Sequence, residues 1–447
     1  MTILIYLIIT ILFIIISTGK YKFHPFLALI VAAIIMGVLG GLDTSIIIKS
    51  ISEGFGNTLK SIGIVIACGS IIGAFLEKTG GAKSIADFLL NLTGKDKSPL
   101  AMNMTGFFVS IPVFCDSGYV ILSSLNNAIN KKTGISLAVL GTSLAAGLYA
   151  SHVFIPPTPG PLAASAIIGA DVGLVLIFGF MIAVPVSLVG WSFSTLYCSK
   201  FLIDAKSSDK HEFESDKKSP NVLIAILPIV IPIIFISLKS FIEHPSIIIE
   251  HDLLEKVIIF LGNPIIALLM GVFTAMATTK DFTLDDHAIW VASGLKSAGT
   301  IILITGAGGA FGNILRSTSL GDSISQQLIS WEIGIFLPFL IAAFLKTAQG
   351  SSTVSIITTA AMIAPILDSL GLSSEMGKVL VVLSIGAGAM TVSHLNDSYF
   401  WVVSQFSNMN TSTAIRCHTV TTLLQGITGI LLIQIFFFIY TLDPSLK

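Results

Sequence analysis

Residues 59–75 read LKSIGIVIACGSIIGAF, and residues 295–311 read LKSAGTIILITGAGGAF, 236 positions later. Both runs are mainly apolar, start with Leu-Lys-Ser and end with Gly-Ala-Phe. Further along, Ser151-His152 and Ser393-His394 each follow a stretch rich in glycine and alanine, with an offset of 242 positions. The nearly constant offset predicts two homologous halves. Paired halves whose apolar segments are interrupted by polar residues at matching places are typical of secondary transporters.

The composition is that of a membrane protein. Apolar residues make up 53% of the chain and charged residues 11%, and the mean hydropathy is +0.92. A soluble domain has about 25% charged residues. A helix needs about 20 residues to cross a bilayer. An all-α polytopic fold is therefore predicted, with its clearest spans at Ile3–Ser17, Phe26–Leu42, Leu59–Leu76, Val172–Cys198, Val222–Leu238, Val257–Ala277, Gly299–Leu315 and Val420–Tyr440.

Several classes of function have no support in the sequence. The net charge is −1 and the charges lie at segment ends, so no nucleic-acid partner is expected. The four cysteines lack C-x-x-C spacing, so no metal site or cofactor is predicted. Residues 306–309 read GAGG but lie inside an apolar span, which argues against a phosphate-binding loop. The chain is not expected to be an enzyme.

Basic residues predict the orientation, because cytoplasmic loops collect Lys and Arg. Alternating spans from an external N-terminus bring most lysines to one side, together with the only long hydrophilic stretch, residues 200–221. We therefore expect residues 200–221 to be a cytoplasmic linker. Lys97 and Lys131 then require residues 100–130 to enter and leave on the same side. Each arm is short for a full crossing, which predicts a re-entrant hairpin with its tip at Cys115–Gly118.

The second half has a matching hairpin, with its tip at Gln349–Thr353. Each half then holds about five transmembrane helices and one hairpin. Because five is odd, the halves lie in opposite orientations, the inverted-repeat plan of many ion-coupled carriers. The predicted first repeat is residues 1–199, with its hairpin at about 100–130 and a broken helix at about 134–170. The second is residues 222–447, with its hairpin at about 333–370 and a broken helix at about 376–407.

Two polar clusters interrupt the first half. Residues 116–118 follow an apolar run and contain a carboxylate, which usually marks a transport pathway when it lies at membrane depth. Residues 151–161 contain four prolines, which leave carbonyls without helical partners. Such backbone persists at membrane depth only inside protein or beside a cavity. A loop outside the hydrocarbon is the alternative for both clusters. The expected site residues here are Asp116, Ser117, Gly118, His152, Pro157 and Thr158.

Two further clusters interrupt the second half. Residues 346–353 combine glycine with Ser and Thr, which allow close backbone approach and supply hydroxyl donors. A helix that begins near Ser351 would also direct its positive end at a carboxylate. Packing between helices is the alternative for the hydroxyl residues, and a structural role is the alternative for both histidines. The expected site residues are Gln349, Gly350, Ser351, Ser352, Thr353, Ser393, His394, Asn396, Asp397 and Ser398. Asp116, Asp397 or His152 is expected to carry a coupling proton.

At these clusters the chain resembles the gluconate permease (GntP) family of proton symporters. The similar stretches are KFHPFLAL at 22–29, SHVFIPPTPGP at 151–161, GAGGAF at 306–311 and SHLNDSYFW at 393–401. The resemblance implies proton-driven import of small hydroxy acids, with gluconate as the expected substrate, across the cytoplasmic (inner) membrane. It also implies a homodimer whose mobile transport domain contains both hairpins, as in the ion transporter superfamily.

The sequence departs from the gluconate type at two positions. Ser117 stands where Val is expected after the acidic residue, and Thr158 stands where His is common. D-glycerate or another small hydroxy acid is therefore the alternative substrate, and sodium is the alternative coupling ion. A channel would need a continuous polar pore, whereas polarity here is confined to a few breaks. An intramembrane enzyme is the third alternative.

Overall fold

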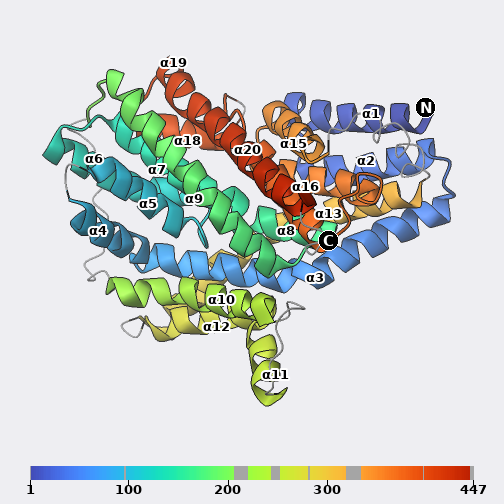
Figure 1. Cartoon of the computed structure of the whole chain (residues 1–447), viewed down its shortest axis with the longest axis horizontal. Coiled ribbons are helices and arrows are strands. Elements are labelled where there is room, and N and C mark those ends of the chain that lie inside the picture. The colour runs from blue at the N-terminus through green and yellow to red at the C-terminus, as the bar shows by residue number, and fades with distance from the viewer. Residues whose placement is uncertain are drawn as a thin grey trace.

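The computed structural model describes residues 2–94, 97–205, 220–242, 252–279, 282–318, 334–395 and 397–442. Helices fill most of this part of the chain, and it contains no strand (Figure 1). The first half comprises α1 (Thr2–Ile15), α2 (Pro25–Leu39), α3 (Thr44–Lys78), α4 (Gly81–Thr93), α5 (Ser98–Val109), α6 (Cys115–Thr133), α7 (Leu137–Phe154), α8 (Pro159–Ile168) and α9 (Val172–Leu196). The second comprises α10 (Val222–Ile242), α11 (Asp252–Leu261), α12 (Pro264–Ala277), α13 (Leu284–Ser317), α15 (Phe336–Gln349), α16 (Ser352–Ile363), α17 (Glu375–Met390), α18 (Ser398–Phe406), α19 (Thr411–Ala414) and α20 (Val420–Leu442).

The apolar helices confirm the predicted polytopic, all-α class. Five helical stretches among the described residues are long and apolar enough to cross a membrane, or seven if each of two bent pairs is one span. One pair is α3, whose parts Thr44–Lys60 and Gly63–Lys78 meet at 47°, and the other joins Glu255–Leu261 to α12 at 68°. The opposite orientation of the halves stays a prediction. Most of the predicted linker, residues 206–219, lies outside the described residues.

Two short helix pairs lie within the residues predicted as hairpins. In the first, α5 ends at Val109 and α6 begins at Cys115. The predicted tip at Cys115–Gly118 was wrong by several residues, because Pro112 cannot continue α5 and the chain turns at residues 110–114 instead. Asp116 therefore lies in the first turn of α6. In the second pair, the chain turns at Gly350, whose φ of +87° favours glycine.

The two broken helices differ in how they are interrupted. Helix α7 continues through Ser151-His152 to Phe154, and the prolines then separate it from α8. Helix α17 ends earlier, at Met390, and Val392 has a φ of +57°. Ser393 therefore lies in the break itself, whereas its sequence match in the first half lies inside a helix.

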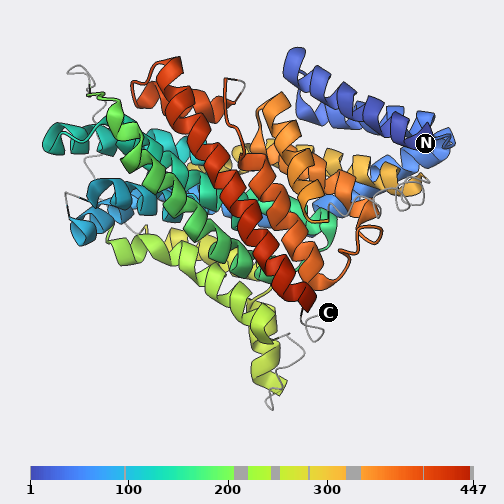
Figure 2. The same cartoon turned by 45° about the horizontal axis from the view of Figure 1, so that its top comes forward.

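The helices pack in a pattern that repeats when the halves are exchanged. Helix α2 packs on α13 while α12 packs on α3, and α8 packs on α16 while α18 packs on α6. Within each half, α5 packs on α7 as α15 packs on α17. Figure 1 shows α3 extending across the molecule with α10 and α12 beside it, and both views show α20 running obliquely over the other helices toward the C-terminus (Figures 1 and 2). The packing partners therefore correspond when the halves are exchanged, and the symmetry that relates the halves stays a prediction.

The long helices α3 and α13, one from each half, pack against each other along much of their length. A Cβ added to Gly54 would lie 2.5 Å from the carbonyl oxygen of Gly309, so the close approach of α3 and α13 at this point depends on glycine. Asn313 Nδ2 donates to the Ser50 carbonyl oxygen at 2.9 Å, and the Ser50 and Ser317 hydroxyls are 3.1 Å apart. Such small and polar residues are common where membrane helices approach closely.

Candidate functional site

Four helices begin at the interruptions: α6, α8, α16 and α18. Helix α7 contacts α6, α8 and α18, and α17 contacts α8 and α16. The first, longer parts of the two broken helices, α7 and α17, therefore hold these four helices together. A helix N-terminus has N–H groups without intrahelical partners and a partial positive charge. Helix N-termini gathered in this way favour an anionic ligand.

A buried ion pair joins the second hairpin to the second broken helix. Lys346 Nζ, on the last turn of α15, donates to Asp397 Oδ2 at 2.5 Å. The same ammonium group donates to the Gly350 carbonyl oxygen at 2.6 Å. Lys346 is 1% exposed and Asp397 is 3% exposed. Because isolated charges are costly at such depth, each side chain requires the charge of the other.

Asp397 accepts two further hydrogen bonds. As the N-cap of α18, its Oδ1 accepts from the Tyr399 backbone N–H at 3.0 Å. The Ser393 hydroxyl donates to Oδ2. The Ser393 oxygen lies 3.1 Å from His418 Nε2, in the π-helical turn Ile415–Thr419 that precedes α20. π-helical turns inside α-helices occur frequently at functional sites.

Aromatic rings cover the ion pair on the α7 side. Lys346 Nζ lies 5.7 Å from the ring centroid of Tyr149, a distance at which a cation and a ring attract each other. The Tyr149 and Tyr399 centroids are 5.2 Å apart, and the Tyr399 and His418 centroids are 5.3 Å apart. The Tyr399 hydroxyl donates to the Ala145 carbonyl oxygen at 3.1 Å. This packing positions the α18 N-terminus against α7.

The first hairpin and first broken helix also face the pair. Cys115 is buried in the first turn of α6, and α6 packs on both α7 and α18. His152 is buried, and its ring lies 6.2 Å from that of Phe114, at the hairpin turn. The packing of α6 against α7 and α18 places the helix that carries Asp116 beside the helix that carries His152 and the helix capped by Asp397.

The predicted residues of the second hairpin lie around its tip. Ser351 is the N-cap of α16 and its Oγ accepts from the Val354 N–H at 3.3 Å. Ser352 is buried and Thr353 is partly buried, both in the first turn of α16. His394 Nε2 lies 3.0 Å from the Thr347 carbonyl oxygen, which connects the tip to the second break.

The remaining predicted residues are distributed as follows. Gly118 is buried in the first turn of α6, and a Cβ there would lie 2.7 Å from the Leu148 side chain. Pro157 precedes α8, and the hydroxyl of Thr158, the residue before its first turn, donates to the Ile155 carbonyl oxygen at 2.5 Å. Asn396 lies outside the described residues. For three other predicted residues the structure describes the helix but not the side chain: Ser117 in α6, Gln349 in α15 and Ser398 in α18.

Sequence reasoning gave no site role to Lys346 or His418. Lys346 is the single charged residue between Glu332 and Asp368, and that isolation in an apolar segment was a usable signal. His418 follows Arg416 and precedes the last span, where it reads as an ordinary basic residue at a membrane boundary. Only the fold reveals that it is 1% exposed and contacts Ser393.

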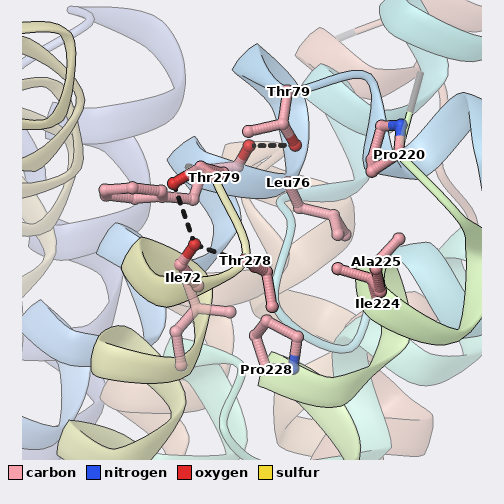
Figure 3. Close-up of a pocket in the computed structure, with 11 residues that line it drawn as sticks. Ile72, Leu76, Thr79, Pro220, Ile224, Ala225, Pro228, Thr278 and Thr279 are labelled. Carbon is pink, nitrogen blue, oxygen red and sulfur yellow. Dashed lines mark hydrogen bonds between the residues drawn. The ribbon is translucent and has the colours of Figure 1, made fainter. Parts of the chain in front are cut away.

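A small cavity between α3, α10 and α12 is not a candidate site. Its volume is about 20 Å³, enough for about one water molecule. Figure 3 shows its apolar lining, including Leu76 and Pro228, and its threonines. Thr79 and Thr278 donate to backbone carbonyls of their own helices at 2.8 and 2.9 Å. The hydroxyls therefore need no ligand.

A larger cavity, of about 140 Å³, lies between α3 and α13 on one side and the C-terminal parts of α8 and α16 on the other. Asn57, Thr58 and Asn313 supply its polar lining. Gly309 and Gly312 line the α13 wall. The cavity therefore lies where α3 and α13 face α8 and α16, the two helices whose N-termini belong to the candidate site.

Comparisons with known proteins agree with this arrangement. The profile of GntP family permeases matches residues 1–439. A gluconate permease of Pseudomonas aeruginosa is 31% identical over 95% of both chains, and the D-serine transporter DsdX of Escherichia coli is 29% identical over 95% of this chain and 96% of its own. In fold, the crystal structure of the YdaH transporter of Alcanivorax borkumensis is similar, with a TM-score of 0.59 at 14% identity over 89% of both chains. With the helical permease-like fold and a match along nearly its whole length, this chain belongs to the GntP permease family.

Proposed function

We propose that this permease imports gluconate by proton symport across the cytoplasmic membrane, as a homodimer. The observation that carries the proposal is the buried group of Lys346, Asp397 and four helix N-termini at the interruptions of both halves. An anion is the ligand that such N-termini favour, and a buried carboxylate is the group that a coupling proton would neutralise. A gluconate permease is among the relatives of this chain.

In this proposal the tip of the second hairpin binds the substrate. The first turn of α16 offers backbone N–H groups to the carboxylate, and Ser352 and Thr353 offer hydroxyls to the sugar-acid chain. Further substrate contacts are proposed from both halves. The second half contributes Gln349, Ser393, His394, Asn396 and Ser398. The first half contributes Ser117, Gly118, His152, Pro157 and Thr158. Asp397, Asp116 or His152 carries the proton.

The two halves are proposed to be inverted repeats, with residues 1–199 and 222–447 in opposite membrane orientations. The exchange of packing partners between the halves supports a two-fold relation. The lysines on one side of the predicted spans support the direction. With this orientation the 140 Å³ cavity opens toward the outer side and provides an approach to α8 and α16 for the substrate.

D-glycerate is the second candidate substrate. Ser117 is more polar than the valine expected at this position in the gluconate type, which suits a smaller acid such as glycerate, and Thr158 is a second departure from that type. Another relative is named a D-serine transporter, so the substrates of relatives extend to three-carbon carboxylates. Sodium is the second candidate for the coupling ion.

The test is uptake of labelled substrate by the purified protein in liposomes. Gluconate should accumulate when the outside is made acidic, without sodium, and unlabelled D-glycerate and D-serine in excess measure the preference among acids. Accumulation of D-glycerate but not gluconate would replace the substrate and keep the mechanism. Accumulation only with a sodium gradient would refute proton symport.

A further inference from the structure

We propose that the substrate carboxylate replaces Asp397 as the partner of Lys346, and that the released Asp397 receives the coupling proton. The inference rests on the proposed function and assigns the coupling to one exchange of partners. Lys346 becomes the cation that binds substrate, a role that the sequence did not indicate. In the empty carrier, Asp397 occupies the Lys346 ammonium group until the substrate anion competes for it.

The position of Lys346 supports the exchange. Its ammonium group lies beside the second hairpin tip, since it bonds the Gly350 carbonyl oxygen at 2.6 Å, and it is also bonded to Asp397 in the second break. Ser352, at the start of α16, follows that tip by two residues and is buried. A carboxylate at the α16 N-terminus is therefore within the range of the Lys346 ammonium group, whose three donors allow a change of acceptor.

Charge balance makes the exchange a coupling rule. In the empty carrier the Lys346–Asp397 pair is neutral, because the two charges cancel. The loaded site is neutral as well, with Lys346 paired to the substrate and Asp397 protonated. Substrate alone leaves one excess negative charge, and a proton alone leaves one excess positive charge. An excess charge is costly in a buried site, so the two neutral states are the ones that can move across the membrane.

A chain of hydrogen bonds leads to Asp397. His418 Nε2 lies 3.1 Å from Ser393 Oγ, which donates to Asp397 Oδ2. Within the described residues, the buried His418 Nδ1 has no hydrogen-bond partner. A proton that binds Nδ1 lets the Nε2 proton pass to Ser393 while the Ser393 proton passes to Asp397. The Nδ1–H bond, a new Ser393 O–H bond and the Asp397 O–H bond form, while the Nε2–H bond and the original Ser393 O–H bond break, and His418 ends neutral in its other tautomer.

Other titratable groups surround this chain and are the competitors in any measurement. They come from α15, α6, α7, the second break and α18, and they are Lys346, Cys115, Asp116, Tyr149, His152, His394 and Tyr399. The experiment therefore counts protons directly instead of assigning a pH midpoint to one group.

The experiment is calorimetric titration of the protein in nanodiscs with gluconate, repeated in buffers of different ionisation enthalpy. The native protein should take up about one proton per gluconate bound. This measurement tests the inference without any substitution. In liposomes, an imposed membrane potential without a pH gradient should not drive accumulation, because one proton and one monocarboxylate carry no net charge together.

Three variants separate the roles. Asp397→Asn should bind gluconate without proton uptake and should exchange labelled for unlabelled substrate without accumulating it. Lys346→Gln should weaken binding at least tenfold, and the double variant, which leaves no unpaired charge, should bind weakly and take up no proton. Asp368→Asn is the matched control, because this carboxylate is exposed at the far end of the second hairpin. Its affinity and proton count should equal those of the native protein.

The outcomes distinguish the inference from the proposed function. Gluconate binding without proton uptake in the native protein would refute the inference and leave sugar-acid transport standing. One proton still taken up by Asp397→Asn, or unchanged affinity in Lys346→Gln, would also refute it. Absence of binding and uptake for gluconate, D-glycerate and D-serine alike would refute the proposed function itself, and the inference with it.

Discussion

Replacing Gly350 with alanine tests whether the second hairpin tip binds substrate. Gly350 has φ +87° and ψ −17°, ends α15, and directs its carbonyl oxygen to Lys346 Nζ. An L-residue in the left-handed region costs about 1–2 kcal/mol. If the unliganded variant relaxes this strain by leaving the tip geometry, and the bound state restores that geometry, the strain appears in the binding free energy and the affinity should fall by about 5- to 30-fold.

The matched control is Gly371→Ala, at the opposite end of the same hairpin. Gly371 has φ +66°, and an added Cβ would meet no atom within 4 Å. The same backbone strain should therefore lower the thermal stability without lowering the affinity. Gluconate binding in nanodiscs and the melting temperature are measured for both variants. Normal gluconate affinity in Gly350→Ala, or an equal loss in both variants, would refute the argument that the tip belongs to the site.

Three further predictions concern other parts of the molecule. Ser352→Ala should weaken gluconate binding about tenfold or more if its hydroxyl bonds the charged carboxylate, since such a bond contributes about 1.5–3 kcal/mol; unchanged affinity with a lower folded yield would indicate packing instead. Gly147→Ala and Gly388→Ala should each destabilise the protein by about 1–3 kcal/mol, because the new methyl would overlap a carbonyl oxygen of the adjacent hairpin arm, whereas Gly56→Ala, in open space, should melt like the parent. A cysteine at Ser208, with the native cysteines replaced, should react with impermeant thiol reagents only from the cytoplasmic side, and labelling from outside would contradict the inverted orientation.

The repeat in the sequence predicted related halves but not their local equivalence. Ser151-His152 and Ser393-His394 match in sequence, yet the first pair lies inside α7 and the second lies beyond the end of α17. The reason is the position of the helix breaker: prolines stop the first helix only after Phe154, whereas the second stops at Met390 without proline. The first hairpin tip was misplaced for a related reason, because Pro112 turns the chain before the polar residues begin.

The sequence by itself determined the membrane class, the all-helical fold, the family and the four polar interruptions, because hydropathy, proline and charge act locally along the chain. Only the tertiary structure decided which polar groups meet. Lys346 and Asp397 are 51 positions apart and Ser393 and His418 are 25 apart, and in both pairs the two residues lie on different elements, so no spacing within one helix predicts either contact. Their contacts depend on how α15, the second break and the turn before α20 pack together. In a buried site, that packing determines which charge neutralises which, because a charge without a partner is too costly to remain.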